Sequence, residues 1–307
     1  MTKIGIVGLG RMGGNLARHA LEEGHEVVGY NRNRERTREL APDGLYPASS
    51  LEELIAQLAP PRFVLLYVPH GNPTEDVCTA LRPLLSSDDI VADGGNSYWP
   101  DSRRRHDWFA GVGVRFLDIG TSGGINGARW GAAFMVGGDR AAFDTVAPVL
   151  RDLATDDEAV YFAGGPGSGH FVKLVHNAIE FGMVQAIAEG VELLDRSGYE
   201  LDMPGLFRHW NHGSVIRSWL IELMGNALAE HPDFSDLSTY VEDTEEVKWM
   251  VQWALEQDIP IPVVSQAQTA LMQYRDLGWP QSKAVALLRN QYGGHRVHKA
   301  TEHHVRR

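Results

Sequence analysis

Lys173, Asn177 and Glu180 lie in one mostly apolar stretch of the sequence. On an α-helix, side chains at this spacing share one face. Burial disfavours the charged form of an amine, so the pKa of a lysine in such a stretch falls. Lys173 is therefore a candidate general base, Glu180 a candidate acid and Asn177 their polar neighbour. The alternative is an ordinary Glu–Lys surface pair, although seven positions rather than four separate the two residues.

A glycine motif lies near the N-terminus, directly after a short β-branched run at 4–7 and before a helical pattern at 11–23. It fits G-x-G-x-x-G, and this strand–turn–helix context is typical of dinucleotide-binding sites. In such sites the glycines let the backbone approach the pyrophosphate, which lies at the helix N-terminus. A plain glycine turn is the alternative. The predicted contacts are Gly8, Gly10, Arg11, Met12 and Gly13.

The segment after the second predicted strand, 27–30, bears on the choice of nicotinamide cofactor. NAD sites usually have Asp or Glu there to hold the ribose hydroxyls. This chain has Asn31 and Arg32 instead, and an arginine can hold a 2′-phosphate. NADP is therefore favoured over NAD. The alternative is that the arginines only line a solvated helix start, which we expect for Arg34, Arg36 and Arg38.

Strand-like and helix-like segments alternate through the first half of the chain. The continuous apolar run 63–68 predicts a strand buried on both faces, with Val68 at its end near the cofactor. A helix is expected over 73–85, and further strands over 90–92, 114–119 and 132–136. This rhythm predicts an α/β fold of Rossmann type with a doubly wound, mostly parallel sheet.

The glycine cluster at 164–169 marks a change of character. A helix of about eight turns is expected from 170 to about 197, and helical patterns split by prolines follow. We therefore predict a dinucleotide-binding domain over 1–164 and an all-α substrate and dimerisation domain over 165–307, with a polar tail from about 293.

Composition restricts the partners and the compartment. The net charge of −12 argues against binding to nucleic acid or to an acidic membrane surface, because both need a positive field. No apolar run reaches membrane-spanning length, and the N-terminus lacks a signal-peptide pattern. Cys78 is the only cysteine, which suits a reducing compartment. These features predict a cytosolic protein.

Several motifs together resemble those of decarboxylating 6-phosphogluconate dehydrogenases, within the β-hydroxyacid dehydrogenase superfamily. The segment 173–177 with Glu180 is similar to the catalytic motif of that family. The segment 93–97 is similar to its loop between cofactor and substrate, and 121–128 is similar to its substrate loop. The segments 213–218, 248–249 and 292–295 also resemble family landmarks, in family order. The chain length resembles that of the short members, which lack a duplicated helical half.

The resemblance implies that Lys173 takes the proton of the substrate 3-hydroxyl while hydride leaves C3. After the carboxylate is lost, Glu180 would protonate the resulting enediol at C1 of the enediol. Asn96 would lie between cofactor and substrate. No metal is expected, because the ketone of a β-keto acid accepts the electrons itself. The predicted contacts to the carboxylate and hydroxyls are Asn96, Ser122, Gly123, Gly124, His176 and Asn177.

The resemblance also implies a basic site for the substrate phosphate, made of Lys248, Arg275, Arg289 and His295. In the family, the counterparts of Arg289 and His295 come from a neighbouring subunit, which implies at least a dimer, with a tetramer left open. Phe181 departs from the tyrosine that is usual after the catalytic glutamate, so one phosphate donor is missing. A related enzyme for another 3-hydroxy or aldonic acid is therefore the alternative. A cofactor-binding protein without catalysis would not be expected to keep Lys173.

Overall fold

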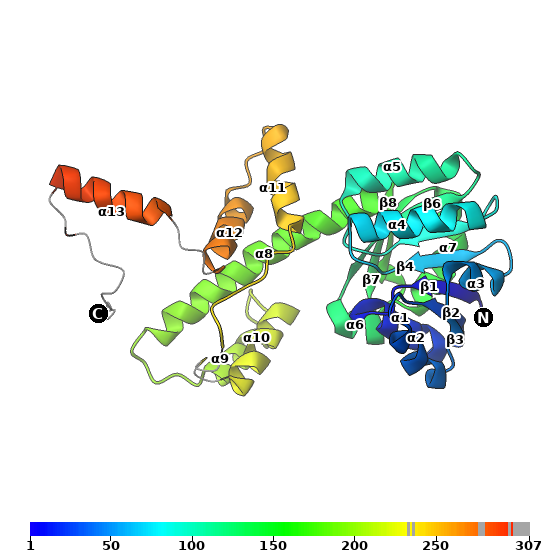
Figure 1. Cartoon of the computed structure of the whole chain (residues 1–307). Helices are drawn as coiled ribbons and strands as arrows, with labels where there is room; N and C mark the ends of the chain where they lie inside the picture. Colours follow the sequence, from blue (N-terminus) through cyan, green and yellow to red (C-terminus); the bar gives the residue numbers. More distant parts are fainter. Residues whose placement is uncertain (232–233, 235–236, 276–279, 294–295, 297–307) are drawn as a thin grey trace. The chain divides into compact units, whose positions relative to one another are not determined.

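The computed structural model describes residues 1–231, 234, 237–275, 280–293 and 296. The chain divides into two compact units. The first contains Met1–Val184 and Glu245–Val264, and the second contains Gln185–Thr244 and the segment from Ser265 onward. The long helix α8 runs from one unit into the other (Figure 1).

One eight-stranded sheet forms the centre of the first unit, in the order β3-β2-β1-β4-β5-β6-β7-β8. Neighbouring strands are parallel except β6 and β7. The strand order reverses between β1 and β4, and in such sheets the crevice at this point is where ligands bind. The bounds are β1 (Lys3–Val7), β2 (Glu26–Tyr30), β3 (Tyr46–Ala48), β4 (Phe63–Leu66), β5 (Ile90–Asp93), β6 (Arg115–Ser122), β7 (Ala133–Gly138) and β8 (Val160–Gly164).

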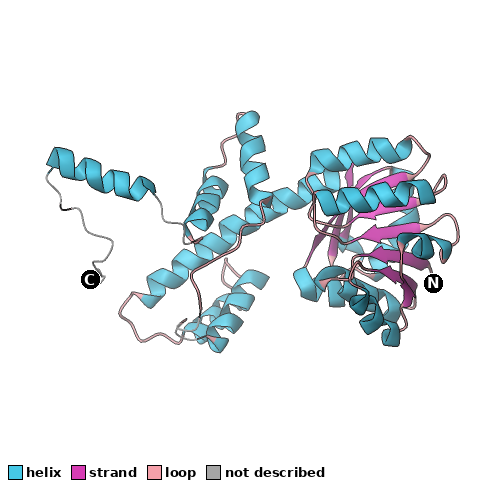
Figure 2. Cartoon of the chain, in the orientation of Figure 1, coloured by secondary structure: helices cyan, strands magenta, loops and turns pink. Residues whose placement is uncertain are grey.

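Helices cover both faces of this sheet (Figure 2). One core cluster joins the sheet to α1, α6 and α7, for example through Leu16 and Val146. A second cluster on the other face joins it to α3, α4 and α5, for example through Leu54 and Phe109. The bounds are α1 (Arg11–Glu22), α2 (Arg34–Leu40), α3 (Leu51–Ala56), α4 (Asn72–Leu81), α5 (Trp99–Ala110), α6 (Gly124–Trp130) and α7 (Arg140–Asp152), with short 3₁₀ turns at Ala41–Asp43, Arg82–Leu84 and Asp157–Ala159.

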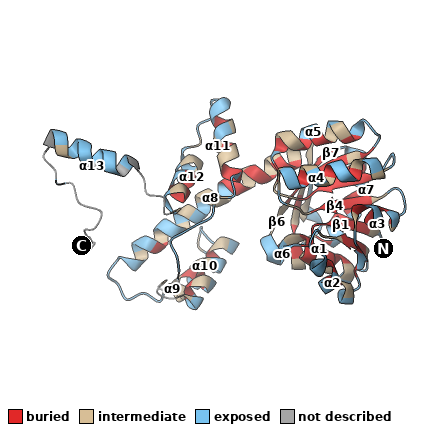
Figure 3. Ribbon diagram, in the orientation of Figure 1, coloured by how far each residue is buried: buried red, intermediate tan, exposed pale blue. Residues whose placement is uncertain are grey.

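Helices α8 to α13 follow the last strand of the sheet in the chain. The C-terminal part of α8 packs on α9 and α10 through a cluster that includes Val191, Phe207 and Ile221. Helix α11 belongs to the first unit together with the start of α8, whose buried residues are visible in Figure 3. The bounds are α8 (Ser168–Asp195), α9 (Met203–Asn211), α10 (Trp219–Glu230), α11 (Glu246–Glu256), α12 (Pro262–Gln273) and α13 (Pro280–Gly293).

The predicted fold class, a doubly wound α/β sheet followed by helices, is confirmed. The apolar run 63–68 is a strand only as far as Leu66. The Tyr67 N–H still donates to the Val7 carbonyl of β1 at 2.8 Å, and the chain forms a loop beyond it. The domain boundary at 164 stays a prediction. Most of the predicted tail from about 293 lies outside the described residues. Within the described chain, no helix combines the length and apolar character needed to cross a bilayer.

Candidate active site

The polar stripe of α8 forms a connected group of side chains. Lys173 Nζ donates a hydrogen bond to Asn177 Oδ1 at 2.7 Å and lies 3.2 Å from His176 Nδ1. His176 Nδ1 in turn lies 3.7 Å from a carboxylate oxygen of Glu180. Lys173 is only 9% exposed, whereas the Glu180 side chain is 43% exposed. A buried base and a more accessible acid therefore share one face of the helix.

Glycines bring this helix unusually close to the sheet. A Cβ added to Gly120 of β6 would lie 2.3 Å from Lys173 Cβ. A Cβ added to Gly169, near the start of α8, would lie 2.3 Å from the carbonyl oxygen of Asp118. Only residues without a side chain permit this approach. The position of Lys173 thus depends on Gly120 and Gly169 as much as on its own helix.

Asp118 holds the first turn of α8 in place. Its buried carboxylate accepts hydrogen bonds from the backbone N–H groups of Gly167 at 2.7 Å and His170 at 2.8 Å. A carboxylate at a helix N-terminus satisfies unpaired donors and complements the helix dipole. The turn of helix that precedes Lys173 is therefore anchored to β6.

The surroundings of Lys173 lower the pKa of its amine below the ordinary value. Burial is the main cause, and the carboxylates of Glu180 and then Glu246 oppose it. Because the effect of burial on this pKa is larger than the opposing effect of the two carboxylates, a larger fraction of the amine is neutral at a given pH than in a solvated lysine. A neutral amine is the form that can accept a proton.

A loop at the end of β6 faces His176. Ser122 Oγ lies 3.1 Å from His176 Nε2, so β6 and α8 are joined by a polar contact at this point. Gly123 and Gly124 follow with φ of +110° and +60° and lead into α6. Successive backbone N–H groups in such a turn can hold an anion. The predicted substrate contacts Ser122 and His176 are therefore brought together with Lys173.

The loop after β5 carries Asn96 and is held by a buried ion pair. Asp93 accepts hydrogen bonds from the Gly95 N–H at 3.0 Å and from Ser97 Oγ at 2.8 Å. Arg105 of α5, fully buried, donates to the same carboxylate at 3.2 Å. Asn96 Nδ2 donates to a carboxylate oxygen of Glu246 on α11. This loop therefore joins the sheet, α5 and α11.

The glycine motif fits a dinucleotide. Gly8 has φ of +93°, and a Cβ there would lie 2.3 Å from the carbonyl oxygen of Tyr67. A Cβ on Gly13 would lie 2.0 Å from the Gly8 carbonyl oxygen, so α1 packs directly on the turn. A Cβ on Gly10 would meet no heavy atom of the described chain within 4 Å. This open backbone at the start of α1 suits a pyrophosphate. Val68 lies against Gly8, at the predicted cofactor edge.

The polar residues that follow β2 have different contacts and different exposure. Asn31 Oδ1 accepts from the Leu9 N–H at 2.9 Å, and its Nδ2 donates to the Asn33 carbonyl at 3.0 Å. The Asn31 side chain thus fixes the glycine loop itself. Arg32 is exposed. Arg36, which was expected only on a solvated face, lines a hollow of about 220 Å³ next to the glycine motif. Its other lining residues are Leu9, Gly10, Arg11, Gly14, Asn15, Arg18, Glu39 and Leu40.

The predicted phosphate-binding residues are spread over the two units. Lys248 lies on α11, where the neighbouring Trp249 packs its ring 5.0 Å from His70 and 5.2 Å from Tyr98. Arg275 lies 4.0 Å from a carboxylate oxygen of Asp243 in the second unit. Arg289 is exposed on α13, and His295 lies outside the described residues. The phosphate site therefore stays a prediction.

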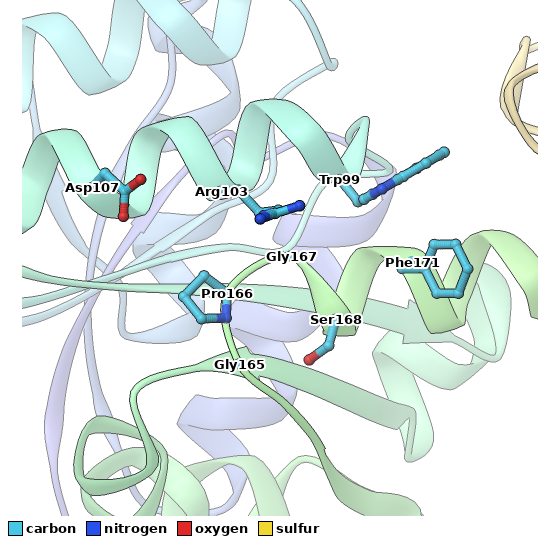
Figure 4. Close-up of a pocket in the computed structure, with 8 residues that line it drawn as sticks. All are labelled: Trp99, Arg103, Asp107, Gly165, Pro166, Gly167, Ser168 and Phe171. Carbon is cyan, nitrogen blue, oxygen red and sulfur yellow. The ribbon is translucent and has the colours of Figure 1, made fainter. Parts of the chain in front are cut away.

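A hollow of about 470 Å³ lies beside the first turns of α8 (Figure 4). Phe171, which contributes to its wall, is two positions from Lys173 and so points to the other side of the helix. The hollow is therefore separate from the polar stripe. Its lining residues are Trp99, Arg103, Asp107, Gly165, Pro166, Gly167, Ser168 and Phe171.

Sequence reasoning missed three features of the site: Glu246, the Asp93–Arg105 pair and Gly120. Glu246 lies in an acidic segment that reads as solvated surface, and its contact with Asn96 spans 150 positions of the chain. Arg105 lies in a run of three arginines, of which it alone is fully buried. No local pattern distinguishes these residues. Among the described residues, no cluster of His, Cys, Asp or Glu has the arrangement of a metal site.

Comparison with known proteins identifies the family. Residues 3–164 match the family model described as the NAD binding domain of 6-phosphogluconate dehydrogenase. Residues 169–273 and 195–306 match the model of the C-terminal domain of the same enzyme. Together the two models cover nearly the whole chain, including the glycine motif and α8.

Individual relatives agree with these models. The chain is 42% identical to Bacillus subtilis YqeC, whose provisional name is also 6-phosphogluconate dehydrogenase, over 97% of this chain and 99% of YqeC. It is 40% identical to the NAD(+)-dependent, decarboxylating 6-phosphogluconate dehydrogenase of Haloferax volcanii, over 86% of this chain and 88% of the relative.

A solved structure of Plasmodium falciparum 6-phosphogluconate dehydrogenase, described with NADP+ and with 6-phosphogluconate, is similar to the present one. Its TM-score is 0.83 at 30% identity, and the match covers 98% of this chain and 67% of that one. The near-complete coverage of YqeC and the partial coverage of the Plasmodium chain agree with a short form. The chain belongs to the 6-phosphogluconate dehydrogenase family.

Proposed function

We propose that this protein oxidises 6-phosphogluconate with NADP or NAD and releases its carboxylate as carbon dioxide, which leaves ribulose 5-phosphate. The observation that carries the proposal is the buried Lys173, held at 2.7 Å by Asn177 on the helix face that also carries Glu180. The Haloferax relative, named for this reaction, supports it.

The chemistry follows from the two ionisable groups on α8. When bound at the glycine motif, NADP or NAD would supply the acceptor for the hydride that leaves C3 of the substrate. Lys173, in its neutral form, takes the proton of the 3-hydroxyl as that carbon is oxidised. The resulting β-keto acid loses its carboxylate, because the ketone accepts the electron pair and takes back a proton from Lys173. Glu180 then donates a proton to C1 of the enediol, which was C2 of the substrate. The hydroxyl on the neighbouring carbon, the former C3, gives its proton to Lys173, which leaves the ketone of ribulose 5-phosphate.

Glu180→Gln should separate the two halves of this reaction. We expect hydride transfer to persist while protonation at C1 slows by about 10²-fold, because the amide cannot donate the proton. A stopped-flow trace of cofactor absorbance should show a burst of reduction that precedes product release. Glu189→Gln, on an exposed part of the same helix, should behave like the wild type. If oxidation and product formation slowed equally, Glu180 would not be the acid that protonates C1 of the enediol.

The substrate would be held by groups from three elements. Ser122 and His176 are in contact at 3.1 Å, and Asn96 lies on the adjoining loop. Lys248, Arg275, Arg289 and His295 would supply positive charge for the phosphate. Phe181 offers no hydroxyl, so the phosphate would depend on these cations.

The direct test is absorbance of the reduced cofactor with 6-phosphogluconate and, separately, with gluconate. Reduction with the phosphorylated acid alone supports the proposal; reduction with neither, or with gluconate alone, would overturn it.

NADP is the favoured cofactor, because Arg32 is exposed at the end of β2 where NAD sites usually carry an acid. Two relatives are nevertheless named as NAD(+)-dependent. Arg32→Ala should raise the KM for NADP by roughly tenfold, the worth of one charge-assisted bond, and leave the KM for NAD unchanged. Arg38→Ala, exposed on α2, is the matched control. Equal changes for both cofactors would contradict the assignment of Arg32 to the 2′-phosphate.

We also propose that the protein is a homo-oligomer in the cytosol. Large apolar side chains are exposed on the helices after residue 168, including Ile179, Leu193, Val263 and Leu288, each more than half exposed. Such surfaces favour association between subunits. The proposed division into a domain at 1–164 and a domain at 165–307 assigns them to the substrate and dimerisation part.

A further inference from the structure

Glu246 lies in the active site although it is not on α8 and was not predicted from the sequence. It is the first residue of α11 and only 8% exposed. Its carboxylate accepts a hydrogen bond from Asn96 Nδ2. A buried carboxylate is costly to desolvate, so its retention needs specific partners. Asn96 supplies one of them.

Packing of α11 fixes where this carboxylate lies. Met250, four positions after Glu246 and therefore on the same helix face, is buried in one apolar cluster with Leu174 and Ala178 of α8. Trp249 packs against Tyr98, which lies two residues after Asn96. The face of α11 that carries Glu246 thus contacts both α8 and the loop of Asn96. The position of Glu246 is set by an apolar cluster, not by a surface contact.

The charged groups around Lys173 come from several elements. Glu180 and His176 are on α8, and Glu246 on α11 is the second carboxylate that acts on the Lys173 amine. Asp118 of β6 is engaged by the start of α8, and Asp93 by Arg105. Glu246 is therefore the carboxylate from outside α8 that opposes the effect of burial on Lys173.

We propose that Glu246 is a positioning residue of this active site, which orients the Asn96 amide and adds a carboxylate from α11 to the surroundings of Lys173. The proposal rests on the proposed function, in which Asn96 contacts the substrate and Lys173 is the base. Because Asn96 Nδ2 donates to Glu246, the oxygen of the Asn96 side-chain amide stays available to accept a hydrogen bond from a substrate hydroxyl. Glu246 itself need not touch the substrate.

Glu246→Gln keeps an oxygen that can accept from Asn96 but removes the negative charge. The carboxylate raises the pKa of Lys173, so its removal should lower that pKa. The acidic limb of the kcat/KM profile should then move to lower pH, with KM little changed. Glu246→Ala also removes the acceptor, and should raise the KM for 6-phosphogluconate by roughly tenfold. Glu256→Gln, exposed at the other end of α11, is the matched control.

A second readout does not depend on turnover. The sequence has lysine only at Lys3, Lys173, Lys248, Lys283 and Lys299, so NMR of ε-¹³C-labelled lysine can follow the Lys173 titration in the protein alone, with Lys173→Arg for assignment. A lower Lys173 pKa in Glu246→Gln than in Glu256→Gln supports the proposal, even if 6-phosphogluconate is not the substrate. The same titration in both variants would overturn it, even if the wild type turns over 6-phosphogluconate.

Discussion

Lys173→Met should lower kcat by about 10²–10⁴-fold, while the Kd for NADPH changes little. The reason is that Lys173 is the buried group with a lowered pKa on the face of α8 that also carries Asn177 and Glu180, and methionine fills a similar volume without accepting a proton. The measurements are initial rates with 6-phosphogluconate and a fluorescence titration of the reduced cofactor.

Two further variants make this result specific. Lys173→Arg should not restore turnover, because a guanidinium remains protonated at any pH that the protein tolerates. Lys283→Met, the same change at an exposed position of α13, should keep the wild-type rate. Activity in Lys173→Met within tenfold of the wild type would show that another group is the base.

Arg105→Met should lower the free energy of unfolding by about 3–5 kcal/mol, because it leaves the Asp93 carboxylate buried without its cation. Arg105 is fully buried and donates to Asp93 at 3.2 Å and to Glu75 at 2.7 Å. Asp93 also holds the loop of Asn96, so the KM for the substrate should rise as well. Urea unfolding at neutral pH measures the loss.

Arg104 offers a control in the adjacent position. It also pairs with Glu75, at 2.6 Å, but its side chain is 55% exposed. Exposed ion pairs contribute at most about 1 kcal/mol, so Arg104→Met should have a small effect. Asp93→Asn combined with Arg105→Met should recover part of the stability, because no charge is then left buried. Equal destabilisation by the Arg104 and Arg105 variants would contradict the role given to burial.

The sequence predicts those parts of the site that lie within one element. Lys173, Asn177 and Glu180 share a helix face because of the helix repeat alone, and the bond from Lys173 to Asn177 agrees with that spacing. The glycine motif is likewise local, since strand, turn and helix follow one another in the chain. The alternation of strands and helices was enough to predict the sheet class.

Contacts between distant segments were not predictable in this way. Glu246 and Asn96 are 150 positions apart, and no periodicity marks Glu246 as buried. The short strand β3 contains a proline and lies at the sheet edge, so it lacks the apolar run of a central strand. Gly120 gives no signal in a strand pattern, because its importance comes from the approach of α8.

The most direct test of the proposed reaction uses 6-phosphogluconate labelled with ¹³C at C1, with NADP and the purified protein. Labelled carbon dioxide and reduced cofactor are measured together, for the wild type and for Lys173→Met. We expect one labelled carbon dioxide for each reduced cofactor in the wild type, and formation of both products at least about a hundredfold slower in the variant. Reduced cofactor without labelled carbon dioxide, or both products in the variant at a rate close to that of the wild type, would rule out the proposed mechanism.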